Sequence, residues 1–129
     1  MIRIIAAVAL LAGAAQAQEV PSEVHTLGKQ KVTLHLHPFL TGEETATLRV
    51  VATNQDALNL FLTRPGRHAA IAVAPAEGFL RAGQPVASAS ALSDLPRAEA
   101  ARAGALEVCN KARAKGPDCV VVLEVAPGS

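Results

Sequence analysis

The sequence predicts an α+β domain, a two-layer sandwich in which two helices pack on a mainly antiparallel sheet. Three observations support this prediction. Lys31–His37 alternates apolar and polar residues, residues 67–74 are apolar on both faces of a strand, and residues 93–125 read as helix, turn and strand. From Thr45 the expected order is strand, helix, strand, strand, helix, strand. That order matches a ferredoxin-like βαββαβ arrangement with an additional N-terminal strand.

The N-terminus has the pattern of a secretory signal peptide, residues 1–17. A short positive start, Met1-Ile-Arg3, precedes the apolar run Ile4–Ala12, and Ala15-Gln-Ala17 is a small-x-small cleavage site. The apolar run is shorter than the roughly 20 residues needed to cross a bilayer, so we expect no membrane span. The sequence therefore predicts a periplasmic or secreted protein.

The remaining 112 residues suffice for one domain, which we place at residues 31–129. Residues 18–30 show no regular apolar period, and we interpret them as a lead-in segment. Without residues 1–17 the chain carries 11 basic and 11 acidic residues, and it contains no Tyr or Trp. A neutral chain without stacking aromatics has no footprint for nucleic acid, so we expect the partner to be a protein or a small ligand that the sequence does not identify.

In the first half, the alternation of residues 31–37 is typical of a half-buried strand with one polar face. Residues 41–44 are expected to form a turn, with Glu43-Glu44 facing water. Residues 45–53 are rich in β-branched side chains, which favours a second strand paired with the first. Asn54 is a good N-cap for a short helix that ends at Arg64-Pro65-Gly66.

The second half begins with a strand, residues 67–74, which is expected to be covered on both faces. Residues 85–91 alternate small polar and small apolar side chains and are interpreted as another strand. Ser93 or Asp94 can cap a long alanine-rich helix, and Gly116 is expected to end it in a left-handed conformation.

Residues 68–127 carry the spaced motifs Ala69-Ala-Ile-Ala-Val-Ala-Pro-Ala-Glu-Gly78, Ala100-Ala101, Ala105-Leu106, Cys109-Asn110 and Cys119-Val-Val-Val. This half of the chain resembles small exported bacterial proteins of unknown function, with a cysteine pattern similar to the domain of unknown function DUF4189. Some relatives are labelled 5-aminolevulinic acid synthase. Such an enzyme requires a Schiff-base lysine and a phosphate cradle, which this sequence does not show, so we do not transfer the label.

His35-x-His37 is the candidate metal site. Alternate residues of a strand project from the same face, so the two imidazoles could bind Zn or Cu together. A complete site needs further ligands, and His25 or His68 could supply a third. The alternative interpretation is a polar strand face that carries two histidines.

No set of residues in the sequence predicts catalysis or a cofactor. Ser88, Ser90 and Ser93 lack a nucleophile-elbow motif, and the glycines do not form a phosphate loop. Our first hypothesis is therefore a non-catalytic binding or accessory module. A metal-binding protein that uses the histidine pair is the alternative, and a small hydrolase whose residues only the fold assembles is the third.

Cys109 and Cys119 are expected to form a disulfide. They are the only two cysteines, and export would place them in an oxidising compartment. Cys109 lies on the apolar stripe of the expected helix, and Cys119 starts a strand whose face continues with Val121, Leu123 and Val125. Both sulfurs should therefore point into one helix–sheet interface.

Ala70 and Ala72 form a thin apolar face opposite Ile71 and Val73 in the expected central strand. A thin face must be covered if it is to leave water. The first hairpin, a loop or a second copy of the chain could cover it, and we favour a homodimer.

Overall fold

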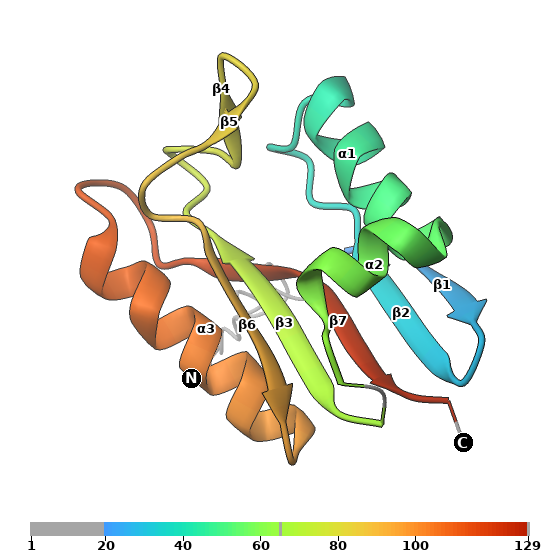
Figure 1. Cartoon of the computed structure of the whole chain (residues 1–129). Coiled ribbons are helices and arrows are strands. Elements are labelled where there is room, and N and C mark those ends of the chain that lie inside the picture. Colours follow the sequence, from blue (N-terminus) through green and yellow to red (C-terminus); the bar gives the residue numbers. More distant parts are fainter. Residues whose placement is uncertain (1–19, 65, 129) are drawn as a thin grey trace, which may run out of the picture.

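The chain forms a five-stranded antiparallel sheet with helices on both faces (Figure 1). A computed structural model describes residues 20–64 and 66–128. In chain order, the elements are β1 (Ser22–Leu27), β2 (Gln30–His35), α1 (Gly42–Thr53), α2 (Gln55–Phe61), β3 (His68–Val73), β4 (Leu80–Arg81), β5 (Gln84–Pro85), β6 (Ser90–Leu95), α3 (Ala98–Ala112) and β7 (Val120–Pro127). The sheet order is β1-β2-β7-β3-β6, and β4 and β5 form a separate small hairpin. The predicted signal peptide, residues 1–17, lies outside the described residues.

The predicted α+β class and antiparallel sheet are confirmed, and after β1 the elements follow the expected order strand, helix, strand, strand, helix, strand if α1 and α2 count as one helical layer and the small β4–β5 hairpin is set aside. The ferredoxin-like topology and the two-layer arrangement are wrong. A ferredoxin-like fold needs two right-handed crossovers, which place both helices on one face. Here α1 and α2 lie on one face of the sheet and α3 lies on the other, so the two crossovers have opposite hand. Nothing in the local sequence pattern specifies the hand of a crossover.

Residues 45–53, predicted as a strand, belong to α1. Thr41 and Glu44 form a capping box: the Glu44 N–H donates to Thr41 Oγ1 at 3.1 Å, and the Thr41 N–H donates to Glu44 Oε1 at 2.9 Å. Leu48 and Ala52, four residues apart, are buried on the inner face. The cap and the helical spacing outweigh the β-branched composition. The predicted Asn54 cap of α2 is confirmed, because Asn54 Oδ1 accepts from the Ala57 N–H at 2.9 Å.

The lead-in prediction for residues 18–30 is also wrong, because residues 22–27 form β1, an edge strand paired with β2.

The start of the long helix lies later than predicted. Asp94 belongs to β6 and has a φ of 63°, and its carboxylate accepts from the Thr63 hydroxyl and the Arg64 N–H. It therefore cannot cap α3, which begins at Ala98 after an N-cap, Arg97, that makes no side-chain cap. Of the predicted strand 85–91, only Pro85 in β5 and the start of β6 are extended.

The sheet separates two cores of different composition. Between the sheet and the α1–α2 pair lies a cluster of mostly large aliphatic side chains: Val32, Leu34, Leu48, Ala52, Leu58, Leu62, Ala69, Ile71, Val73, Val122, Leu123 and Val125. Between the sheet and α3 lies a thin cluster: Ala70, Ala72, Ala74, Ala101, Ala105, Cys109 and Cys119. We name them the aliphatic core and the alanine core.

The alternation of β3 confirms the prediction of a strand that is covered on both faces. The face formed by Ala70 and Ala72 is covered by α3 of the same chain. A second copy of the chain is therefore not needed to cover this face, and the homodimer expected on that ground stays a prediction. Among the residues that the structure describes, no helix is long and apolar enough to cross a membrane.

Candidate functional site

A groove of about 380 Å³ lies beside α3, where the sheet continues beyond the helix. α3 packs mainly on β3, β6 and β7, so none of the described helices covers this face of β2. The groove combines ionisable and apolar side chains from β2, α3 and β7, namely Val20, His35, His37, Arg102, Leu106, Cys119, Val120, Val121 and Glu124. It is the place in the described part of the chain where both predicted histidines meet other charged groups.

A row of three charged or ionisable side chains crosses the groove. His35 Nε2 lies 2.8 Å from Glu124 Oε2, and Arg102 Nη2 donates to Glu124 Oε1 at 2.7 Å. The hydrogen bond from His35, together with the Arg102 hydrogen bond and charge, outweighs desolvation and lowers the pKa of Glu124 to about 2. Glu124 is therefore an ionised carboxylate held from both sides at neutral pH.

Glu124 reaches this face because β7 contains a bulge. Ile71 pairs with Leu123 and Ala72 with Val121, so Val122 is an extra residue on β7. Leu123 therefore belongs to the aliphatic core, and Glu124 lies on the same face as His35. The prediction that Leu123 and Val125 share the face of Cys119 is wrong for this reason. A bulge inserted within an unbroken apolar run leaves no signal in the sequence.

His37 lines the end of the groove near the disulfide. Its Nε2–H donates to the Val121 carbonyl oxygen at 3.0 Å, and its ring stacks on Phe39 with the ring centroids 5.6 Å apart. Burial lowers the pKa of His37, although the Val121 hydrogen bond opposes that shift. The imidazole is therefore neutral at neutral pH, and its Nδ1 makes no hydrogen bond within residues 20–64 and 66–128.

The structure places the two predicted metal ligands on one groove but gathers no third ligand. The ring centroids of His35 and His37 are 6.4 Å apart. Within the described ranges no group of three or more His, Cys, Asp or Glu side chains is arranged to bind a metal. His25 projects from the opposite face and lies 3.1 Å from Glu23, and His68 starts β3. Metal binding stays a prediction without a complete ligand set.

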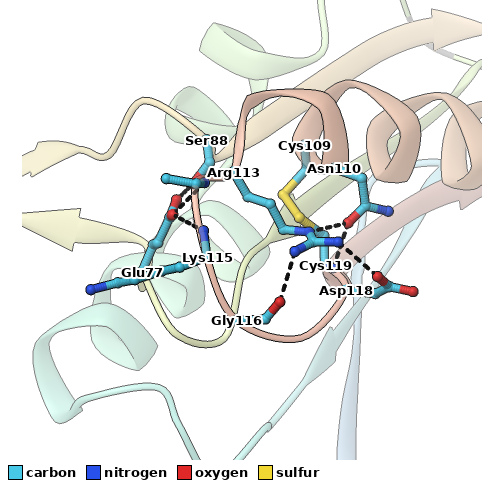
Figure 2. The surroundings of a disulfide bond; sticks show 10 residues. Glu77, Ser88, Cys109, Asn110, Arg113, Lys115, Gly116, Asp118 and Cys119 are labelled. Carbon is cyan, nitrogen blue, oxygen red and sulfur yellow. Dashed lines mark hydrogen bonds and ion pairs between the residues drawn. A yellow bond between two sulfur atoms is a disulfide. The ribbon is translucent and has the colours of Figure 1, made fainter.

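The predicted Cys109–Cys119 disulfide is confirmed, with 6.2 Å between the two Cα atoms. It joins the last turn of α3 to the residue before β7, beside the groove. Figure 2 shows that the Arg113 side chain makes several hydrogen bonds within the loop that the disulfide closes, and we name these contacts the Arg113 brace. Its guanidinium donates to Asn110 Oδ1 at 2.9 Å, to the Gly116 carbonyl at 2.7 Å and to Asp118 Oδ1 at 2.9 Å. Asn110 Oδ1 also accepts from the Cys119 N–H at 2.8 Å.

Glu77 holds the same loop from its other side (Figure 2). Its carboxylate accepts from the Ser88 hydroxyl at 2.6 Å and from the N–H groups of Ala114 at 2.6 Å and Lys115 at 3.2 Å. The Ser88 hydrogen bond, followed by that of Ala114, lowers the pKa of Glu77. We name these three hydrogen bonds the Glu77 latch. The sequence did not predict them, because the partners are far apart in sequence and two of them are backbone groups. With the disulfide, the latch fixes the wall of the groove.

Glu44, predicted to face water, is buried and structural. Beyond its capping bond, its carboxylate accepts from the N–H groups of Phe79 at 2.8 Å and Leu80 at 2.9 Å. Burial alone would raise the pKa of Glu44, but the hydrogen bonds from Leu80, Thr41 and Phe79 together lower it. Glu44 thus ties the start of α1 to the β4–β5 hairpin.

Within residues 20–64 and 66–128, the fold assembles no hydrogen-bonded nucleophile and base for the hydrolase hypothesis. Both cysteines are in the disulfide, the Ser88 hydroxyl donates to Glu77, and that of Ser93 donates to Asp94. No hydrogen bond joins a serine hydroxyl to a histidine in the described part of the chain.

Two other hollows carry less chemistry than the groove. The larger, of about 540 Å³, lies between the β1–β2 turn and α2, and Lys29 is its one charged lining residue. A smaller one, of about 210 Å³, is almost entirely apolar, with Phe61 and Phe79 among its lining residues. The β2–α3 groove is the candidate site because ionisable groups converge there, not because of its volume.

Comparisons with known proteins gave no match: no family model, curated protein or solved structure is similar to this chain. The resemblance to DUF4189 therefore stays a prediction.

Proposed function

We propose that this chain is an exported, non-catalytic binding domain that holds a small carboxylate-bearing ligand in the groove between β2 and α3. One observation carries the proposal: three nitrogen-bearing side chains, those of His35, His37 and Arg102, converge on a groove whose single carboxylate already contacts two of them, His35 and Arg102. The disulfide supports export, because such bonds persist in oxidising compartments.

The ligand class follows from the donors that remain. The Arg102 side chain is 46% exposed, and one of its N–H groups is committed to Glu124, which leaves the others for a ligand. A guanidinium fork matches the planar geometry of a carboxylate. Leu106 and Val121 add an apolar surface for the rest of the molecule.

The test is a titration of the ¹⁵N-labelled protein with acetate, succinate and citrate, followed by two-dimensional NMR. We expect shift changes concentrated at His35, His37 and Val121, and about tenfold weaker binding in Arg102→Gln, since a charge-assisted hydrogen bond contributes about 1.5 kcal/mol or more. Arg97→Gln is the matched control, because Arg97 is an exposed arginine outside the groove. No localised shifts, or equal weakening in both variants, would refute the proposal.

Export and the metal alternative are tested by the intact mass of protein purified from the periplasm. We expect a chain that begins at Gln18 without a metal adduct. A mass that includes residues 1–17 would contradict the signal-peptide prediction. A stoichiometric metal adduct that is lost in His35→Ala would favour the metal-binding alternative.

A further inference from the structure

The two edge strands of the sheet, β1 and β6, differ in how regular their outer backbone is. Edge strands expose unpaired N–H and C=O groups, and proteins usually interrupt such edges. The β6 edge is interrupted in three ways. Asp94 has a φ of 63°, and the register shifts between His68 and Ala70. The Asp94 carboxylate also accepts hydrogen bonds from Thr63 and Arg64, in the loop between α2 and β3.

The β1 edge has no such interruption. All six residues of β1 pair with β2 in one continuous register, from Ser22 opposite His35 to Leu27 opposite Gln30. Pro21 precedes the strand and none lies within it. The apolar side chain of Val24, near the middle of the strand, is 56% exposed. Among the residues that the structure describes, this regular six-residue strand has no partner on its outer side and can accept a further strand.

The hydrogen-bonding parity of β1 identifies the groups that are free. Leu27 and Gln30 flank a two-residue turn and form a hydrogen-bonded pair, and the Leu36 N–H donates to the Pro21 carbonyl at 2.8 Å. Alternate residues point the same way, so residues 21, 23, 25 and 27 direct their backbone groups toward β2. Ser22, Val24 and Thr26 direct theirs outward.

We propose that β1 pairs with β1 of a second copy of this chain, antiparallel about a two-fold axis at Val24, to form one continuous ten-stranded sheet. In this register Val24 lies opposite Val24 of the second copy, and Ser22 lies opposite Thr26. All three outward-facing residues of each copy form hydrogen-bonded pairs. The proposal does not depend on the ligand groove.

Side-chain chemistry favours this partner and this register. Glu23 of one copy lies opposite His25 of the other, Val24 meets Val24, and the hydroxyls of Ser22 and Thr26 meet. A shift of one residue would set outward-facing groups against inward-facing ones. A shift of two, centred on His25, would oppose two histidines and lose one hydrogen-bonded pair. The strand is therefore self-complementary in one register.

An interface made by one pair of edge strands is small, below the roughly 1,200 Å² of stable complexes, so the dimer should depend on concentration. Sedimentation equilibrium of the full chain from about 10 to about 500 µM should show a monomer–dimer equilibrium. Val24→Lys and Val24→Glu should each be monomeric, because residue 24 faces its own copy. An equimolar mixture of the two should restore dimers. Val24→Thr, which keeps a β-branched side chain, should dimerise like the wild type.

A cross-link tests the register directly. The structure contains no free cysteine, so Val24→Cys introduces a single thiol. Facing Cα atoms in a hydrogen-bonded pair lie about 5.5 Å apart, within disulfide range, and mild oxidation should give a covalent dimer. Thr26→Cys is the control, because Thr26 is also exposed but lies opposite Ser22 of the second copy. It should give at least tenfold less covalent dimer than Val24→Cys.

Two results would overturn the proposal. One is a monomer at every concentration with equal cross-linking of the two cysteine variants. The other is a dimer that Val24→Lys leaves intact while its circular dichroism spectrum matches the wild type. A monomer that instead recruits a strand of another protein would also refute pairing with a second copy.

Discussion

The two faces of the sheet are covered by layers of unlike thickness. On the α1–α2 face, leucines and valines such as Leu34, Leu48 and Leu123 fill the space between helix and sheet. On the α3 face, Ala72, Ala105 and their neighbours bring the helix close to the strands. Because hydrophobic stabilisation scales with buried apolar area, at about 25 cal/mol per Å², alanines contribute less per residue. A thin layer needs other attachments.

Besides the Arg102–Glu124 ion pair, the attachments of α3 lie at its C-terminal end: the disulfide, the Arg113 brace and the Glu77 latch. No comparable covalent link joins α1 or α2 to the sheet. The comparison suggests a division of roles. The aliphatic core contributes most of the stability. On the other face, α3 is held in place next to β2, and the groove forms between them.

The largest expected effect is on the aliphatic core. Leu34→Ala should lower the free energy of unfolding by about 3 kcal/mol, because a fully buried leucine is replaced by a cavity. Urea denaturation measures this. Leu60→Ala is the control, since Leu60 is 88% exposed and its loss should cost less than about 0.5 kcal/mol. Equal losses in both variants would contradict the assignment of this core.

Replacing both cysteines with alanine should cost about 2–3 kcal/mol, the chain-entropy value for closing a loop with a sequence separation of 10. Urea denaturation of the oxidised wild type and the double variant gives the difference. A change near zero would show that the alanine core holds α3 without the disulfide, and the contrast between the two faces would disappear.

Gly116→Ala tests how closely the braced loop packs. Gly116 has a φ of 87°, and an added Cβ would clash with Ala76 Cβ. Gly66 has a similar φ, 80°, but open space around it. Gly66→Ala should therefore cost about 1 kcal/mol from backbone strain alone, and Gly116→Ala should cost about 1 kcal/mol more. Equal costs would show that the loop can move away from Ala76.

The last expected effect is a pH dependence at the groove, which appears only in acid. The pKa of Glu124 is about 2 in the folded chain, against 4.5 for an ordinary glutamate. Its contribution to stability is therefore complete above pH 4.5 and is lost as the pH falls toward 2. Relative to Glu124→Gln, the wild type should lose stability over that window. The exposed Glu107→Gln is the control for removing one charge. Parallel pH curves for wild type and Glu124→Gln would contradict the three-residue row.

Much of the second half could be predicted because its signals are local. Apolar runs specify β3 and β7, helical spacing specifies most of α3, and two cysteines leave one possible pairing. The α1 helix could also have been found, since Thr41 and Glu44 have capping-box spacing. β1 gave little signal, because an edge strand such as Ser22–Leu27 carries mostly polar side chains.

The groove itself could be predicted only in part. The shared face of His35 and His37 follows from strand alternation. The contact of His35 with Glu124 depends on the bulge at Val122. The position of Arg102 beside Glu124 depends on which face of the sheet α3 occupies. Both are tertiary choices, made by packing rather than by local sequence.

The most direct test of the contrast between the two faces is native-state hydrogen exchange, measured by mass spectrometry on the oxidised and the reduced protein. If the disulfide holds the thin layer, reduction should raise exchange in α3 and residues 113–119 by at least about tenfold, while α1 and β2 keep most of their protection. An equal rise in both layers, or no rise in α3, would contradict the account.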